Sequence, residues 1–560
     1  MYQVIGFILF VIFPLTLHAE GESENAVNLL TRELYNKSAY IPSQCYTKTI
    51  DVSGDIHNPC YSCHVKSQRP NYIDDSDLQL NYSFPGDALI NPWANLFKDR
   101  TIEIDAITDD AISEYIRSSN YIAKDDEAGV SPSIALVKRL ADLSEEWDYN
   151  CNKRWDGFTP DAWFNFDGEG FDRDPEYGYT GWRAFAYYPF LGTFWPNNGS
   201  TDDVLIRLPE SFRTDDEGLF SLDIYKVNLA IVEAMLKEKN IPIDPVSEKD
   251  LDGMDIDKDG SIGIANQVTY EWAPLKKQFM TYVGMAKKLQ KDGEIHLAAG
   301  LYPEGTEFLH SVRYIDVNDE GRNQLSARMK ELRYAKKTKW LDYSQLRAQA
   351  DQEVKEKDAF PDRLRTVLGD SEKGVSNGKG WLYAGYIEDA AGELRPQSYE
   401  ELVFCVGCHG GIGGNRDGIF SFARKFDAAL DKNDWLHWSQ LSDKNIAEPL
   451  RVDGEHEYTH YLQHNGSGNE FRSNGEIQQR FFDQDGELKA DQLDLLHEDM
   501  THLLYASKER ALLLNKAYRV IVREQSFVEG RDATLLPLET VHREVLQDEE
   551  TGIDRLLKRF

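Results

Sequence analysis

Two pentapeptides in this 560-residue chain combine thiols and an imidazole at a spacing that suits covalent attachment of a metal-containing cofactor. They read Cys60-Tyr-Ser-Cys63-His64 and Cys405-Val-Gly-Cys408-His409. In each, the thiols stand about one helical turn apart and reach the two vinyl groups of one porphyrin, while the following imidazole binds the iron as proximal ligand. A redox or zinc pair also uses two cysteines at this spacing, but it leaves the following histidine unexplained twice. The spacing therefore predicts two covalent haem c groups.

On these pentapeptides and an N-terminal export signal, the chain resembles the dihaem c-type cytochromes. The resemblance implies a periplasmic electron carrier or a dihaem oxidoreductase. Two enzyme families invite comparison, the bacterial dihaem cytochrome c peroxidases and the rubber-oxygenase-like dihaem proteins. Cys405 follows Cys60 by 345 positions, whereas the peroxidases have two adjacent haem domains with a much shorter gap, so the chain departs from that pattern.

Three classes of function follow from this interpretation. The leading one is an exported dihaem c-type cytochrome that carries out periplasmic electron transfer. The alternative is a dihaem oxidoreductase, peroxidase-like or oxygenase-like, with one electron-transfer haem and one catalytic haem, and the chain length favours it. The third is a structural or sensory protein that uses haem as a redox switch. No catalytic residue is assigned.

The N-terminus has the pattern of a signal peptide. The apolar run Val4–Leu17 has 14 residues, which is short for a membrane span and right for a signal-peptide core. Cleavage after Ala19 would leave Glu20 as the first mature residue, and an uncleaved membrane anchor is the alternative. No cysteine follows the run directly, which argues against a lipid anchor there. We expect a periplasmic or otherwise exported protein without a later membrane span.

The charge of the chain restricts its partners. There are 62 Lys and Arg against 96 Asp and Glu, a formal net charge of −34. Nucleic acids and anionic lipid surfaces select basic faces, so neither is an expected partner. A redox partner protein with a basic docking surface fits this charge. The oligomeric state is left open.

Two cysteines remain outside the pentapeptides, Cys45 and Cys151. In an oxidising compartment an even pair predicts a disulfide. Two free buried thiols, or Cys45 as an unusual haem ligand, are the alternatives.

The distal haem ligands are predicted among the remaining histidines. His310 lies in an apolar strand pattern and His437 in the aromatic sequence Trp435-Leu-His-Trp438, and both are candidate iron ligands. A hydrogen-bonded core histidine is the alternative for His310.

Three further histidines, His456, His460 and His464, recur at every fourth residue and would share one helix face. That face suits a transition metal or one haem ligand, and a solvated polar stripe is the alternative.

Residues 255–262 match the first eight positions of an EF-hand loop. Asp255, Asp257 and Asp259 would bind Ca²⁺ through their side chains and Ser261 through its carbonyl oxygen. Position twelve is Asn266 in place of the usual Glu, which weakens the site or moves the last ligand elsewhere. An acidic surface turn is the alternative, and the turn 483–487 is a weaker echo of the same pattern.

The predicted fold class is α+β and multidomain, with two mostly helical haem regions flanking a mixed, aromatic-rich middle. The expected segments are a signal peptide at 1–19, an N-terminal haem region at 20–148, an aromatic middle with the calcium-like loop at 149–320, a helical connector at 321–380 and a C-terminal haem region at 381–560. Residues 155–195 hold 15 aromatics, which indicates either an aromatic β core or a wall beside a haem or substrate.

Hydrophobic periodicity and capping residues locate the secondary structure. Helices are expected at 23–37, 109–118, 131–145, 219–239 and 507–527, over the charged segment 325–357, and as a surface helix in the last thirty residues. Strands are expected at 204–208, 267–272 and 306–317.

Overall fold

The computed structural model describes residues 27–31, 33–51, 53–123, 132–190, 195–427, 435–437, 439, 446–465 and 474–557. The predicted signal peptide and its cleavage site lie outside these residues, as do the start of the first predicted helix and Ser131, the N-cap expected for the helix at 131–145.

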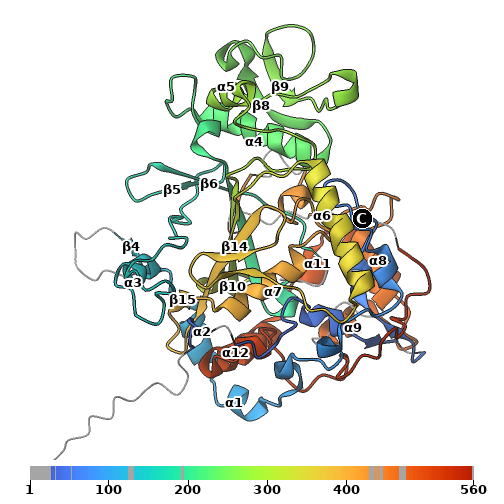
Figure 1. Ribbon diagram of the computed structural model, residues 1–560. Coiled ribbons are helices and arrows are strands. Elements are labelled where there is room, and N and C mark those ends of the chain that lie inside the picture. Colours follow the sequence, from blue (N-terminus) through green and yellow to red (C-terminus); the bar gives the residue numbers. More distant parts are fainter. Residues whose placement is uncertain are drawn as a thin grey trace, which may run out of the picture.

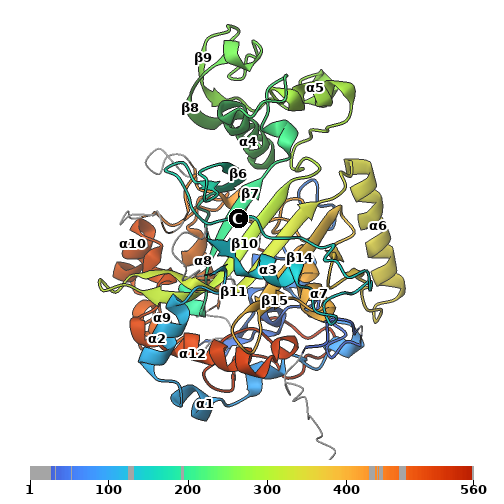
Figure 2. The ribbon, with the colours of Figure 1, turned by 90° about the vertical axis from the view of Figure 1, so that its left-hand side faces the viewer.

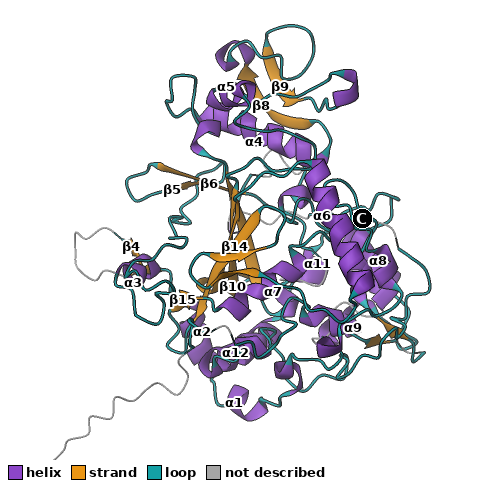
Figure 3. Cartoon of the chain, in the orientation of Figure 1, coloured by secondary structure: helices purple, strands orange, loops and turns teal. Residues whose placement is uncertain are grey.

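A nine-stranded antiparallel sheet runs through the middle of the molecule (Figures 1 and 3). Its strand order is β12-β13-β14-β11-β10-β7-β6-β5, with β15 paired to β14. The fold class α+β is therefore confirmed. The strands are β5 (Phe171–Arg173), β6 (Tyr179–Ala184), β7 (Thr201–Arg207), β10 (Glu307–Val317), β11 (Asn323–Lys337), β12 (Leu368–Asp370), β13 (Gly374–Ser376), β14 (Trp381–Glu388) and β15 (Leu394–Pro396).

The centre of the sheet confirms two predicted strands and corrects one predicted helix. β7 and β10 occupy the segments expected at 204–208 and 306–317. The charged segment 325–357 is not one helix, because its first part forms β11 and only its second part forms α6 (Tyr343–Ala359). The composition of β11 suits a helix, but the strand is hydrogen-bonded to β10 on one side and β14 on the other. Sheet pairing and burial outweigh helix propensity here.

Between β7 and β10 the chain leaves the sheet and forms a separate lobe, at the top of Figure 1. It contains α4 (Leu222–Lys237), β8 (Ile241–Ser247), β9 (Ile264–Val268) and α5 (Met285–Asp292). α4 confirms the helix expected at 219–239, and its N-cap Ser221 accepts a hydrogen bond from the Ile224 amide at 3.4 Å. β9 begins three residues before the strand expected at 267–272 and ends at Val268, so the two segments overlap only in part.

The two terminal regions pack against each other below this lobe (Figure 2). Isolated bridges join Thr47 to Val541, Asn81 to Glu550 and Ile90 to Glu544. The described residues 531–557 therefore form bends, turns and isolated bridges and no surface helix, because their backbone groups pair at these points with the N-terminal region. The expected arrangement of two helical regions flanking a mixed middle is not confirmed, and the segment around the first pentapeptide contains 3₁₀ turns in place of α-helices.

The remaining helices surround the sheet. α2 and α12 confirm the helices expected at 109–118 and 507–527, and the Ser507 hydroxyl accepts a hydrogen bond from the Arg510 amide at 3.1 Å. The short strands β1 (Thr49–Ile50) and β2 (Ile56–His57), and β3 (Ile122–Ala123) and β4 (Ser133–Ile134), form two small hairpins. The helices are α1 (Thr101–Asp105), α2 (Asp109–Arg117), α3 (Ala135–Ala141), α7 (Tyr399–Cys408), α8 (Glu457–Asn465), α9 (Gly475–Phe481), α10 (Ala490–Glu498), α11 (Thr501–Leu504) and α12 (Lys508–Glu524).

Candidate functional site: a cavity lined by both pentapeptides

Both pentapeptides line the same cavity, although they are far apart in the sequence. Its walls come from the N-terminal region, the central strands β10, β11 and β14, and the end of α7. The empty space within these walls is about 2060 Å³, with the open mouth of the cavity included. The predicted residues that meet here are Cys60, Cys63, His64, Cys405, Cys408 and His409.

The two pentapeptides share one backbone geometry. The His64 amide donates to the Cys60 carbonyl at 2.8 Å, and the His409 amide donates to the Cys405 carbonyl at 3.0 Å. Each bond closes a helical turn, so the two thiols of a pair stand one turn apart and the histidine follows them. This is the local arrangement that the spacing predicts.

Different elements position the two turns. The N-terminal turn is the 3₁₀ segment Pro59–Ser62, which begins at Asn58. The Asn58 side chain accepts from the Cys60 amide at 2.8 Å and donates to the Thr47 carbonyl at 2.6 Å. The C-terminal turn ends α7, whose first turn is closed by a capping box between Ser398 and Glu401.

Glycines let the segments around the pentapeptides approach closely. The Gly414 amide donates to the Cys63 carbonyl at 2.9 Å, which joins the two pentapeptide regions directly. A Cβ at Gly407 would lie 2.0 Å from the Tyr40 carbonyl oxygen. Only a residue without a side chain fits there.

The two histidines are held in the neutral form. Burial lowers the pKa of His64 and of His409 to about 4. The His409 Nδ1 lies 2.5 Å from the Gly418 carbonyl oxygen, whereas the buried His64 Nδ1 has no hydrogen-bond partner among the described residues. Neutral imidazole is the form that binds metals, and a carbonyl on one ring nitrogen directs the other nitrogen to the metal.

The Cys405 thiol is buried and the other three pentapeptide thiols are half-buried in the cavity wall. Burial raises the pKa of Cys60 to about 12 and that of Cys408 to about 11, and it also raises the pKa values of Cys63 and Cys405. Reactive cysteines and zinc ligands are thiolates in electropositive surroundings. The raised pKa values of these thiols are the opposite of the lowered pKa that activates a redox cysteine.

The cavity wall also carries a charged group that the sequence analysis missed. Glu331 on β11 lies between two arginines, with Arg333 Nε at 2.9 Å and Arg531 Nη1 at 2.8 Å from its Oε2. Burial alone would raise the pKa of Glu331, but these arginines hold it at about 2. No sequence signal identifies this group, because Arg531 lies 200 positions from Glu331 and all three are ordinary charged residues.

His310 lies in the cavity wall, as a distal ligand requires. Its Nε2 is 3.0 Å from Asp202 Oδ2, and the Tyr187 hydroxyl donates to the same carboxylate oxygen. Tyr187 and Phe190 bring part of the aromatic segment 155–195 to the cavity, while Trp182 of that segment is buried in the core.

His437 is not brought to the cavity. Its Nε2 lies 2.8 Å from Asp203 Oδ2 and its Nδ1 2.6 Å from the Ser439 hydroxyl, and its ring stacks on Phe166. Because both ring nitrogens have protein partners, His437 is a buried hydrogen-bonded histidine in this structure.

The predicted disulfide between Cys45 and Cys151 is wrong, because both cysteines are free thiols. Cys45 lines the cavity beside the pentapeptide thiols, and Cys151 is exposed in a turn. An argument from the compartment alone cannot tell which cysteines the fold brings together.

The three histidines at every fourth residue do not act as one face. His460 and His464 stack on each other with ring centroids 3.8 Å apart, and both rings lie near Tyr61. His456 precedes α8 and stacks on His497.

The calcium-like loop lies between β8 and β9 in the separate lobe. The Glu248 side chain lies beside Asp255 and Asp257 of this loop. One carboxylate oxygen from each of the three residues lies within 4.8 Å of the other two. The buried Asp255 Oδ1 has no hydrogen-bond partner among the described residues. Asp259 and Ser261 follow in the loop, where the Ser261 amide donates to Asp259 Oδ1 at 2.7 Å. Glu248 precedes the loop, and its two carboxylate oxygens accept hydrogen bonds from the Ile256 and Gly263 amides at 2.7 and 2.9 Å. Asn266, at position twelve, offers no carboxylate.

Comparison with known proteins shows the family. A family model described as a "-like lipoprotein" matches residues 29–497. An uncharacterized lipoprotein of Aquifex aeolicus (strain VF5) is 33% identical over 562 aligned positions, which cover 91% of this chain and 88% of the relative. No solved structure matches. The chain belongs to this lipoprotein family.

Family membership corrects the functional assignment made from the sequence. Neither description names a cytochrome or an oxidoreductase. The assignment to the dihaem c-type cytochromes is therefore wrong, and with it periplasmic electron transfer and the peroxidase-like or oxygenase-like alternative. Neither description says what the cavity binds.

Membership of a lipoprotein family agrees with export of the protein. Among the helices of the described residues, none has the length and apolar character needed to cross a bilayer. The first cysteine of the chain is Cys45, which lies in the cavity wall.

Proposed function

We propose that this member of the lipoprotein family is a periplasmic haem-binding protein that holds two covalently attached haem c groups in one cavity. The convergence of both pentapeptides on that cavity, each with the same closed helical turn, carries the proposal. Cys60 and Cys63 would form the thioethers to one group, and Cys405 and Cys408 those to the other. Bound haem would supply an iron centre, whose chemistry depends on its axial ligands and surroundings.

The residues present fit this group. The four thiols line the cavity, and burial lowers the pKa of both imidazoles to about 4, which keeps them neutral. A bond from His409 Nδ1 to the Gly418 carbonyl would direct the other ring nitrogen to the iron. The buried His64 Nδ1 has no hydrogen-bond partner among the described residues. Arg333 and Arg531 line the same cavity. They offer guanidinium groups to carboxylates such as the haem propionates.

His310 is the candidate distal ligand in this proposal. Its ring is oriented by Asp202, and a carboxylate partner of this kind is common for metal-binding histidines. His310→Ala should convert one haem from low-spin to high-spin in electron paramagnetic resonance spectra. Unchanged low-spin signals from both haems in a folded variant would remove His310 from this role.

The mass of the denatured chain tests covalent attachment. Expression with export and haem attachment should give a mass above the apoprotein by two haems, about 0.6 kDa each. Replacing Cys60 and Cys63 together by Ser should remove one haem, and replacing Cys405 and Cys408 together should remove the other. Cys151→Ser, which changes an exposed thiol outside the cavity, should keep both. A wild-type mass without added haem would refute the proposal, and the readout does not require the variants to fold.

We also propose that the loop at 255–261 binds Ca²⁺ as a structural ion. The buried Asp255 Oδ1 without a partner and the nearby Glu248 support this proposal. Extracellular sites of this type bind weakly, at about 10⁻⁴–10⁻³ M. Calcium should raise the melting temperature, and Asp257→Ala should abolish that gain. The control Asp483→Ala, in the exposed turn 483–487, should leave the calcium effect intact. Equal melting with calcium and with chelator would contradict the assignment.

A further inference from the structure

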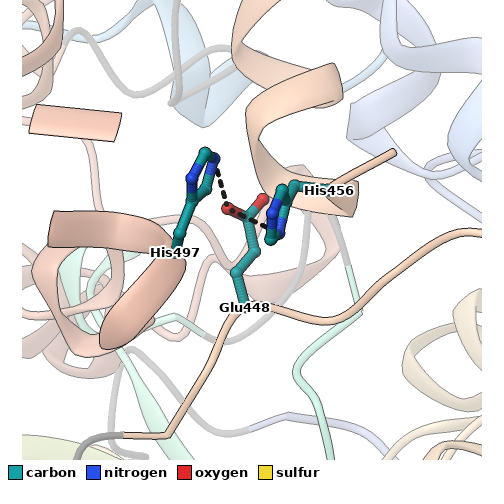
Figure 4. A group of neighbouring side chains, drawn as sticks. All are labelled: Glu448, His456 and His497. Atoms are coloured by element: carbon teal, nitrogen blue, oxygen red, sulfur yellow. Dashed lines mark ion pairs between the residues drawn. The ribbon is translucent and has the colours of Figure 1, made fainter. Parts of the chain in front are cut away.

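A second cluster of metal-binding side chains lies outside the cavity and outside the calcium-like loop. It forms where the segment 446–450 passes between the start of α8 and the end of α10 (Figure 4). The Glu448 amide donates to the His497 carbonyl at 3.3 Å, and the Glu457 amide donates to the Pro449 carbonyl at 2.8 Å. These backbone bonds bring Glu448, His456 and His497 together.

The donor atoms of these three residues converge. His456 Nδ1 and His497 Nε2 each lie 3.7 Å from Glu448 Oε2, and Figure 4 shows both rings turned toward the carboxylate. All three ligand atoms lie within 4.8 Å of one another. Tetrahedral zinc with bonds of about 2.1 Å places its ligands about 3.4 Å apart. Small side-chain movements would therefore reach that geometry.

The surroundings of Glu448 favour a cation. Its side chain is fully buried, and its ion-pair partners among the described residues are these two histidines. A buried carboxylate is stable when it is paired or binds a metal. The His456 Nδ1 atom is itself buried and has no hydrogen-bond partner in the described part of the chain.

We propose that Glu448, His456 and His497 form a site for a divalent transition-metal ion of the zinc type. Two imidazoles and one carboxylate are a ligand set that zinc uses when its fourth position is left to water or another small ligand. The site shares no residue with the cavity, so it stands or falls independently of haem attachment.

The neighbouring residues show how an ion would enter. The side chains of His456 and His497 are 33% and 31% exposed, so solvent reaches the open side. The Thr459 hydroxyl lies 3.0 Å from Glu448 Oε2 and 3.1 Å from His497 Nε2 and holds both. The two rings are stacked with centroids 3.7 Å apart. Binding of a metal ion therefore requires one of the two rings to tilt. His497 would exchange its contact with the Thr459 hydroxyl for a bond to the metal.

Zinc binding by the full-length protein tests the proposal. The protein is stripped with a chelator, supplied with Zn²⁺ in the presence of excess Ca²⁺ to fill the acidic loop, and passed over a gel-filtration column. Elemental analysis should find one zinc per chain. Titration calorimetry should show at least about tenfold weaker zinc binding for His456→Ala, His497→Ala and Glu448→Gln, since even residues outside the first ligand shell cost about that much.

His502→Ala is the matched control. His502 belongs to the neighbouring helix α11, and its Nε2 is bonded to Gln492 and not to the cluster. This variant should bind zinc as the wild type does. If Glu448→Gln fails to fold because the residue is buried, the two partly exposed histidine variants decide the question. No retained zinc, or equal zinc binding in the histidine variants and the control, would overturn the proposal.

Discussion

The N-terminal pentapeptide lies in a region of 3₁₀ turns, whereas the C-terminal pentapeptide ends the α-helix α7. In the first, a single buried side chain, Asn58, fixes the turn by bonding to the backbone on both sides. In the second, helical hydrogen bonds and a capping box do so. The same five-residue pattern therefore forms the same hydrogen-bonded turn in two different structural settings. The relative placement of its thiols and imidazole comes from the pattern itself and not from the surrounding elements.

The two histidines differ in the same way. The His409 ring lies near Tyr383 and Phe420, and its Nδ1 is bonded to the Gly418 carbonyl. The His64 Nδ1 has no such partner among the described residues. A hydrogen-bonded imidazole is the more basic ligand. The His409 ring is thus oriented by a backbone carbonyl, whereas the His64 Nδ1 has no such orienting partner among the described residues.

The largest effect should come from Gly407→Ala. The added Cβ would lie 2.0 Å from the Tyr40 carbonyl oxygen, so a backbone segment would have to move. We expect a loss of about 3 kcal/mol of unfolding free energy, the upper end for overpacking. Chemical denaturation measures it. At the control Gly410→Ala the nearest atom is a side-chain nitrogen of Arg365 at 3.4 Å, and its effect should be small. Equal losses of unfolding free energy in the two variants would show that the close approach of the Tyr40 carbonyl does not restrict the residue at position 407.

Asn58→Ala should have the next largest effect. Asn58 is 1% exposed. Its removal leaves the Cys60 amide without its bond and leaves the Thr47 carbonyl with only the Tyr82 hydroxyl, at 3.2 Å. Unsatisfied buried groups cost about 1–3 kcal/mol each, so a loss of about 2–3 kcal/mol is expected in denaturation. Asn81→Ala, which removes an exposed amide bonded to the Asp548 carbonyl, should cost much less. A comparable loss in the control would argue that Asn58 does not hold the turn.

Local features of the fold were predictable from the sequence because their causes lie within a few residues. The apolar face and cap of α4, the Ser507 cap of α12 and the apolar run of β10 are all local signals. β11 was not predictable, because its composition favours a helix and only its two neighbouring strands make it a strand.

The same distinction between local patterns and contacts among distant residues applies to the candidate sites. The two pentapeptides and the aspartates at 255–259 were visible as short patterns. Their convergence on one cavity was not, and neither were Glu248 beside the acidic loop or His497 beside His456. These contacts join residues that are ordinary in composition, so only the three-dimensional structure identifies them.

The stability of the haem-free chain should depend on pH through both pentapeptide histidines. Both have a folded-state pKa of about 4 through burial, against about 6.5 when unfolded. The unfolded chain therefore binds more protons between these values, so stability should fall as the pH is lowered from 6.5 to 4. His64→Gln and His409→Gln should each remove part of that fall in the melting temperature. The comparison with each parent curve cancels other titrating groups. An unchanged profile in either variant would contradict the assignment for that histidine.

The smallest effect is expected for Ser398→Ala, at the start of α7. The Ser398 hydroxyl accepts one hydrogen bond from the Glu401 amide at 3.2 Å, and an N-cap of this kind contributes about 1 kcal/mol. Glu401 stays in place because Arg395 binds both of its carboxylate oxygens, at 2.8 and 2.9 Å. Ser221→Ala, which removes the N-cap of α4 in the separate lobe, should cost a similar amount in denaturation. If Ser398→Ala were instead as damaging as Asn58→Ala, the helical support of the C-terminal pentapeptide would depend on one side chain as the N-terminal support does, and the contrast between the two regions would fail.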